Sequence, residues 1–197
     1  MSLVLCFIDK EQSTESMAKN RELFDAFAEE LLTERAVRPL VIIGASKIDT
    51  LLLEVLRGFL LPKTSGPKEQ DEILERDPGP LGTFSSRIKI CRRLGLIDPT
   101  LNFTLEKLRA LRNASAHSLL FDDAKSPVRE HFAEFRKSMA SRNSYKLIKE
   151  RYFEEATLNR IEEWQCLLLT VCALLEAIRE KVKQTSGIKG AMRISAG

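Results

Sequence analysis

Apolar residues along this chain recur every three to four positions, which is the period of an α-helix. Residues 14–35 are the first such stretch, with charged residues between the apolar ones. Its apolar positions are Met17, Phe24, Phe27, Leu31 and Leu32. No segment shows convincing two-residue alternation of the kind that marks a half-buried strand. The pattern predicts an all-α fold, a single-domain helical bundle of about five to seven helices.

Residues 37–61 are the most apolar stretch of the chain. They could span a bilayer by length, but Lys47, Asp49, Glu54 and Arg57 lie inside them. Each such charge costs about 2.5–3.5 kcal/mol near the centre of a membrane, so a central bundle helix and no membrane association are expected.

Residues 157–184 form a heptad seam, which should pack lengthwise against another helix. The seam consists of Ile161, Trp164, Leu168, Val171, Leu175, Ile178 and Val182. Two partners stay open: the helix at 37–61, or the same helix of a second subunit.

Turn-forming residues divide the rest of the chain. Residues 62–80 are a loop rich in proline and glycine, and its length suggests either a functional loop or a mobile one. A helix at 83–94 should stop at Gly95, and Asp98-Pro99 should begin the next one. The organisation predicted is an N-terminal extension (1–13), a helical domain (14–184) and a disordered tail (185–197).

Composition narrows the class of protein. The 197 residues are 30% charged and 44% hydrophobic, with a net charge of +3, as in a soluble globular protein without a strong pull toward nucleic acid. The cysteines, Cys6, Cys91, Cys166 and Cys172, form no C-x-x-C pair, so we expect buried thiols and neither a metal nor a cofactor. Their reduced state and the lack of a signal peptide favour the cytoplasm.

The densest combination of loop glycines and basic residues lies just before and within the helix at 83–94. Its candidate binding residues are Gly79, Gly82, Ser85, Arg87 and Lys89. The helix start behind Gly82 offers backbone N–H groups to an anion. Alternatively, the glycines only permit the turn, and the basic side chains form a solvated face or pair with acidic loop residues such as Asp71, Glu72 or Asp77.

The following helix closes on Arg112, Asn113 and His117. Five residues turn a helix by roughly 140°, so Arg112 and His117 of one copy do not converge on one atom. Arg112 continues the line of buried leucines and should lie at the edge of the buried face. Two copies about a two-fold axis could bring both residues to a shared cleft suited to phosphodiester chemistry. The alternative is an ordinary helix end, with Arg112 satisfying a carboxylate.

The sequence Arg112-Asn113-x-x-x-His117, late in a helix, resembles the R-x4-6-H motif of the HEPN superfamily. That resemblance implies a metal-independent ribonuclease of a toxin or defence system, acting as a dimer on RNA, with Arg112, Asn113 and His117 as catalytic residues. Other members are inactive helical modules, so an antitoxin or a nucleotide-binding accessory role also stays open.

The segment from Asp77-Pro78-Gly79-Pro80-Leu81-Gly82 to Leu94-Gly95-Leu96-Ile97 is similar to the signature of the mannitol operon repressor (MltR-like) family. This resemblance implies a bacterial cytoplasmic regulator that is all-helical. No convincing helix-turn-helix pair is present, so we expect no sequence-specific DNA binding. The first expectation is a repressor-type transcriptional regulator, not an enzyme, acting as a homodimer through contacts with a protein partner. The alternative is the HEPN-type ribonuclease.

Overall fold

The structure, a computed structural model, describes residues 3–60, 71–75, 79–119, 121–153 and 157–191, with side chains from residue 18 to residue 183. It divides into two compact units, Met1–Arg35 and Ala36–Gly197. The first unit contains one helix, α1 (Leu3–Thr33). This helix begins before residue 14, where the periodicity starts, because residues 3–33 contain no glycine or proline to stop it.

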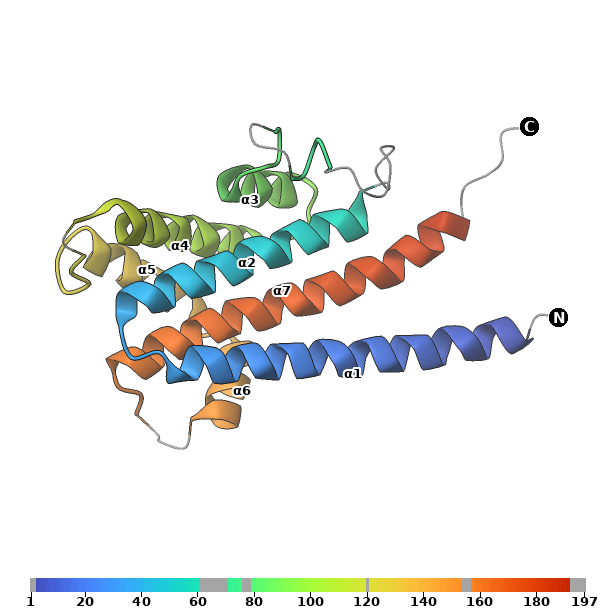
Figure 1. Cartoon of the computed structure of the whole chain (residues 1–197), viewed down its shortest axis with the longest axis horizontal. Helices are drawn as coiled ribbons and strands as arrows, with labels where there is room; N and C mark the ends of the chain where they lie inside the picture. The colour runs from blue at the N-terminus through green and yellow to red at the C-terminus, as the bar shows by residue number, and fades with distance from the viewer. Residues whose placement is uncertain (1–2, 61–70, 76–78, 120, 154–156, 192–197) are drawn as a thin grey trace. The chain divides into compact units, whose positions relative to one another are not determined.

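The second unit contains the remaining helices (Figure 1). They are α2 (Val37–Phe59), α3 (Phe84–Arg93), α4 (Pro99–His117), α5 (Val128–Met139), α6 (Asn143–Tyr152) and α7 (Arg160–Ala191). No strand occurs in the described parts of the chain. The prediction of an all-α bundle of about five to seven helices is confirmed.

The core of the second unit is the pairing of α2 with α7, which lie side by side (Figure 1). The heptad seam therefore packs against the internal partner. Gly44 of α2 lets the two backbones approach closely, since a Cβ atom there would lie 2.8 Å from both methyl carbons of Leu168. The α5 and α6 helices also contact α7, and every residue from Trp164 to Cys172 is buried.

The predicted helix boundaries around α3 and α4 are confirmed. Thr83 caps α3 in a capping box with Ser86, and Gly95 follows the helix with a φ of 71°, a left-handed conformation that favours glycine. Asp98 caps α4, with Pro99 in the first helical turn. These local signals place the two helices that carry most of the candidate residues.

The C-terminal helix is longer than expected. It continues past Gln184 to Ala191, through Gly187 and Gly190, whereas disorder was expected from residue 185. A glycine inside a helix costs only about 1 kcal/mol relative to alanine, which is less than is needed to end a long helix outright. The rest of the predicted tail, 192–197, lies outside the described residues.

The cysteines were expected to be buried free thiols, and the described ones are. Cys91, Cys166 and Cys172 are free and buried, and burial raises the pKa of each thiol to about 12. The side chain of Cys6 lies outside the described side chains. Among the helices described, none is long and apolar enough to cross a membrane.

Candidate functional site

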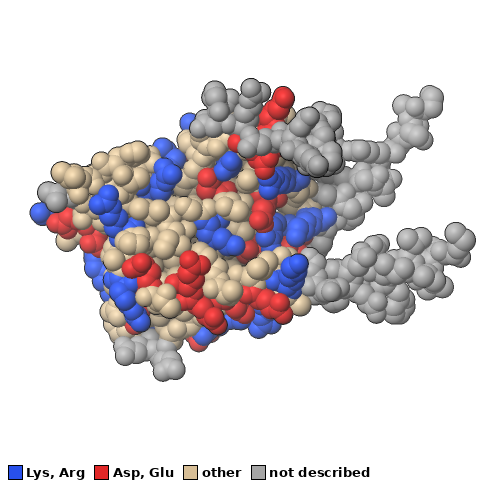
Figure 2. Space-filling view, in the orientation of Figure 1, with Lys and Arg blue, Asp and Glu red and all other residues tan. Residues whose placement is uncertain are grey.

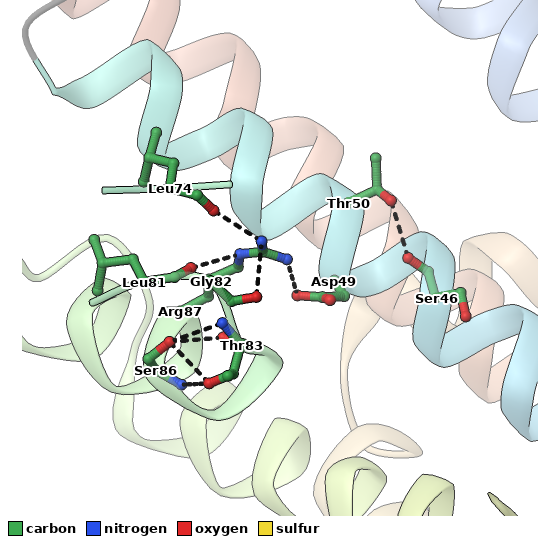
Figure 3. Close-up of polar contacts among 9 residues, drawn as sticks. All are labelled: Ser46, Asp49, Thr50, Leu74, Leu81, Gly82, Thr83, Ser86 and Arg87. Carbon is green, nitrogen blue, oxygen red and sulfur yellow. Dashed lines mark hydrogen bonds and ion pairs between the residues drawn. The ribbon is translucent and has the colours of Figure 1, made fainter. Parts of the chain in front are cut away.

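Arg87, a candidate binding residue, is itself buried and is the centre of a partly buried hydrogen-bond cluster (Figure 3). Its Nε donates to the Leu81 carbonyl oxygen at 3.0 Å, and its Nη1 donates to Asp49 Oδ1 at 2.7 Å. Its Nη2 donates to the carbonyl oxygens of Leu74 (2.9 Å) and Gly82 (3.3 Å). We call these five residues the Arg87 clamp. It ties the loop before α3 to both α2 and α3.

The start of α3 positions this arginine. Thr83 Oγ1 accepts from the backbone N–H of Ser86, and Ser86 Oγ accepts from the backbone N–H of Thr83, both at 3.2 Å. The backbone N–H of Arg87 then donates to the Thr83 carbonyl oxygen at 3.0 Å. The capping box sets where the helix begins, and the clamp fixes the side chain of Arg87 toward α2.

Burial decides what Arg87 can do. Its exposed fraction is 8%, and three of its four acceptors are backbone carbonyls. Asp49 supplies the compensating charge, so a buried cation is paired, as burial requires. The acidic partners suggested by the sequence were Asp71, Glu72 and Asp77. Asp71 instead accepts from the backbone N–H groups of Ile73 and Leu74, and Asp77 lies outside the described residues.

The other candidate binding residues do not converge on Arg87 as a ligand site. The N–H of Gly82 donates to the Gly79 carbonyl at 3.3 Å, which closes the turn, while the Gly82 carbonyl faces Arg87. Ser85 is half-buried and Lys89 is exposed. Two positions along a helix differ by roughly 200°, which explains why Arg87 and Lys89 face opposite ways.

Sequence reasoning did not assign Asp49 to this site. The available signal was a carboxylate inside the most apolar helix of the chain, which needs a partner when it is removed from water. Its partner lies 38 residues away in sequence, beyond the reach of any local pattern.

The Arg112, Asn113 and His117 side chains lie on the last turns of α4. Arg112 and His117 are exposed and Asn113 is half-buried. The expectation that Arg112 lies at the edge of the buried face is wrong. The buried positions step from Leu108 to Leu111 and Ser115, because the face alternates steps of three and four and so leaves Arg112 in solvent.

A second arginine, which the sequence did not single out, reaches the same end of α4. Arg38 of α2 donates from Nε to the Ser115 carbonyl oxygen at 2.7 Å. Carbonyls of the last helical turn lack intrahelical partners, so Arg38 satisfies one of them and places a positive charge at the negative end of the helix dipole.

Beside Arg38 the surface is hollowed into a groove with a volume of about 590 Å³. Its lining includes Arg38, Leu119, Phe121, Asp122, Pro127 and Val128. A volume of this size lies within the usual range of ligand pockets, roughly 300–1,000 Å³. We call this feature the Arg38 groove.

Surface charges of the two signs are interspersed on the face shown in Figure 2. Several cations are paired: Lys107 with Glu134 at 2.5 Å, Arg142 with Asp98 at 3.0 Å and Arg160 with Asp123 at 2.6 Å. No continuous basic patch is visible on this face among the described residues. Nor do the described residues bring three His, Cys, Asp or Glu side chains together in a way that could hold a metal ion.

These features define a class: all-α bundles in which a long C-terminal helix packs along an apolar helix, with a clamped loop before a short helix. Two solved structures are similar to this chain in overall fold. One is described as a possible transcriptional regulator, YggD, from Shigella flexneri 2a str. 2457T, with a TM-score of 0.56, 14% identity, and coverage of 79% of this chain and 98% of that one. The other is the MtlR–HPr complex from Escherichia coli, with a TM-score of 0.52, 21% identity and the same coverages.

At these identities the likeness shows a common fold. The predicted resemblance to the mannitol operon repressor family is thereby confirmed at the level of fold. No protein-family model matches the chain, and no curated protein matches it in sequence. The HEPN resemblance, the homodimer and the cytoplasmic location stay predictions.

Proposed function

We propose that this protein is a transcriptional regulator of the mannitol-repressor type that acts by binding a partner protein. The observation that carries the proposal is the fold shared over 79% of the chain with two proteins. One of them is described as a possible transcriptional regulator, and the other was solved in complex with a protein, HPr. We expect the regulator to work as a cytoplasmic homodimer.

The chemistry of the described surface supports protein contacts over direct reading of DNA. Arg87 of α3 is buried and donates its hydrogen bonds within the clamp. The basic residues that α3 exposes to solvent are Lys89, Arg92 and Arg93. Interspersed charges of both signs suit a protein interface, whereas DNA binding draws on clustered cations that neutralise several phosphates. The clamp then holds Leu74, Leu81 and Gly82 against the start of α3.

Isothermal titration calorimetry with purified HPr tests the proposal. We expect saturable binding with a one-to-one stoichiometry per chain, and in parallel only weak, salt-sensitive binding to DNA in gel-shift assays. Absence of HPr binding would exclude an HPr-type partner. Nanomolar, salt-resistant affinity for one operator would contradict the proposed mode of action.

The ribonuclease alternative has one observation in its favour. Arg112 and His117 are both open to solvent, as a site acting on RNA requires. In that reaction His117 would take the proton of a ribose 2′-hydroxyl as its oxygen attacks the adjacent phosphorus and expels the 5′-oxygen. Arg112 and Asn113 would bind the phosphate oxygens.

Cleavage of mixed RNA substrates in excess EDTA tests this alternative, with Arg112→Ala and His117→Ala beside the unmodified protein. Cleavage that both substitutions abolish would establish a metal-independent ribonuclease. No cleavage by the unmodified protein would remove the alternative.

A further inference from the structure

The Arg38 groove combines a hydrogen-bonded arginine with several apolar side chains. The Nε of Arg38 is held by the Ser115 carbonyl, which fixes the plane of the guanidinium group. Its two terminal nitrogens have no hydrogen-bond or ion-pair partner among the described residues, and the side chain is exposed. A planar guanidinium with both terminal nitrogens available can bind a carboxylate through two parallel hydrogen bonds.

Asp122, the one acidic residue among the described residues that line the groove, pairs with Lys125 and not with Arg38. Asp122 Oδ1 accepts from the backbone N–H of Ala124 at 2.9 Å, and Asp122 Oδ2 lies 3.2 Å from Lys125 Nζ. The hydrogen bond from Ala124 and the neighbouring Lys125 lower the pKa of Asp122, which therefore stays ionised and paired with the lysine. Arg38 is left as the uncompensated charge of the groove.

Part of the lining beside this charge is apolar, and the rest consists of Ser118, Asp122, Lys125 and Ser126. Leu119 is 92% exposed, the highest value among the large apolar side chains described, and Phe121, Pro127 and Val128 line the same groove. Exposing leucine in this way costs solvation free energy that a bound apolar side chain would recover. A hollow that is partly open to solvent suits a chain segment better than a small molecule, whose sites enclose most of the ligand surface.

We propose that the Arg38 groove binds a segment of a partner protein that carries an aspartate or glutamate next to an apolar residue. The carboxylate binds the Arg38 guanidinium, and the apolar side chain packs on Leu119 and Phe121. This inference rests on the proposed function, because it gives the partner protein a docking site.

Selection from a phage-displayed library of random octapeptides against the full chain tests the proposal. We expect enriched peptides to place an acidic residue within one or two positions of a leucine or an aromatic residue. Replacing that carboxylate by its amide in a synthetic peptide should weaken binding about tenfold, as loss of a charge-assisted bidentate contact does.

Two variants assign the binding to this groove. Leu119→Asp introduces a like charge beside the ligand carboxylate at a side chain that is almost fully exposed, and Arg38→Gln removes the cation. Each should weaken peptide binding about tenfold. The matched control is Leu147→Asp, which changes an exposed leucine of α6 outside the groove and should leave binding unchanged.

The remaining outcomes are distinct. No enrichment, or equal binding to all variants, would overturn the proposal. If the protein probe of the calorimetric experiment binds the unmodified chain and Leu119→Asp equally, the groove assignment fails while the proposed function stands. If Leu119→Asp converts a dimer to a monomer in sedimentation experiments, a second copy occupies the groove and the proposal is wrong.

Discussion

Arg87 and Arg38, both in the second unit, each donate to backbone carbonyls, but Arg87 is buried and Arg38 is exposed. Arg87 uses Nε, Nη1 and Nη2 within the protein and is 8% exposed. Arg38 uses only Nε, on one carbonyl of α4, and presents the rest of its guanidinium group to a groove. Both satisfy backbone carbonyls that would otherwise lack donors. Only Arg38 keeps donors available for a ligand.

This difference changes how basic residues in the sequence should be interpreted. Arg87 lies in a basic stretch after loop glycines, a pattern typical of an anion site, yet its guanidinium group is paired with Asp49. Arg38 stands in an otherwise unremarkable first turn of an apolar helix. The availability of a cation follows from its unsatisfied donors, not from the density of basic residues around it.

Among the substitutions of charged residues, the largest expected effect comes from Arg87→Ala. It removes the donor of four hydrogen bonds and leaves Asp49 without its partner, so the free energy of unfolding should fall by about 3 kcal/mol. Urea unfolding measures it. Lys89→Ala, two residues along the same helix but exposed, is the matched control and should change stability by less than about 0.5 kcal/mol. Equal losses for the two variants would contradict the clamp.

A double-mutant cycle between Arg87 and Asp49 should show the next largest effect. Because Asp49 is partly exposed, we expect a coupling free energy of about 1–2 kcal/mol. The pair Arg142 and Asp98, in which Asp98 is half exposed, should couple by less than about 1 kcal/mol. A coupling at the clamp no larger than at this surface pair would show that the backbone carbonyls, not Asp49, hold Arg87.

Arg38→Ala should cost less than Arg87→Ala. It removes one donor from the Ser115 carbonyl and a favourable charge at the end of α4, worth about 1 kcal/mol together. Arg38→Lys keeps the charge and should recover part of that loss in thermal unfolding. A loss for Arg38→Ala as large as that for Arg87→Ala would mean that the terminal nitrogens also have structural partners, which would remove the contrast between the two arginines.

The smallest effects are expected at the end of α4. Arg112→Ala and His117→Ala replace exposed side chains without a partner among the described residues, and each should change the free energy of unfolding by less than about 0.5 kcal/mol. Leu111→Ala, next to Arg112 but fully buried, should cost about 2–5 kcal/mol. Destabilisation by Arg112→Ala comparable to that of Leu111→Ala would contradict the exposed position of Arg112 and place it on the buried face of α4.

Local patterns in the sequence predicted much of the fold. The stop at Gly95 and the cap at Asp98 act within a few residues, so the sequence predicted the end of α3 and the start of α4 directly. The heptad spacing of α7 required an apolar helix as its partner. It did not distinguish α2 from a second subunit, because both offer an apolar face of the same period.

The candidate site was less accessible to the same reasoning. Gly79, Gly82 and Arg87 were candidate binding residues, but whether Arg87 faces solvent depends on Asp49 of α2, which lies 38 residues earlier in the chain. The sequence by itself determined the helical class, the end of α3, the start of α4 and the need for a buried pairing along α7, because helix propensity, capping and periodicity are local. Only the tertiary structure decided that Arg87 meets Asp49 at 38 residues of separation and that Arg38 meets Ser115 at 77, because helix packing, not sequence proximity, brings these groups within hydrogen-bond distance.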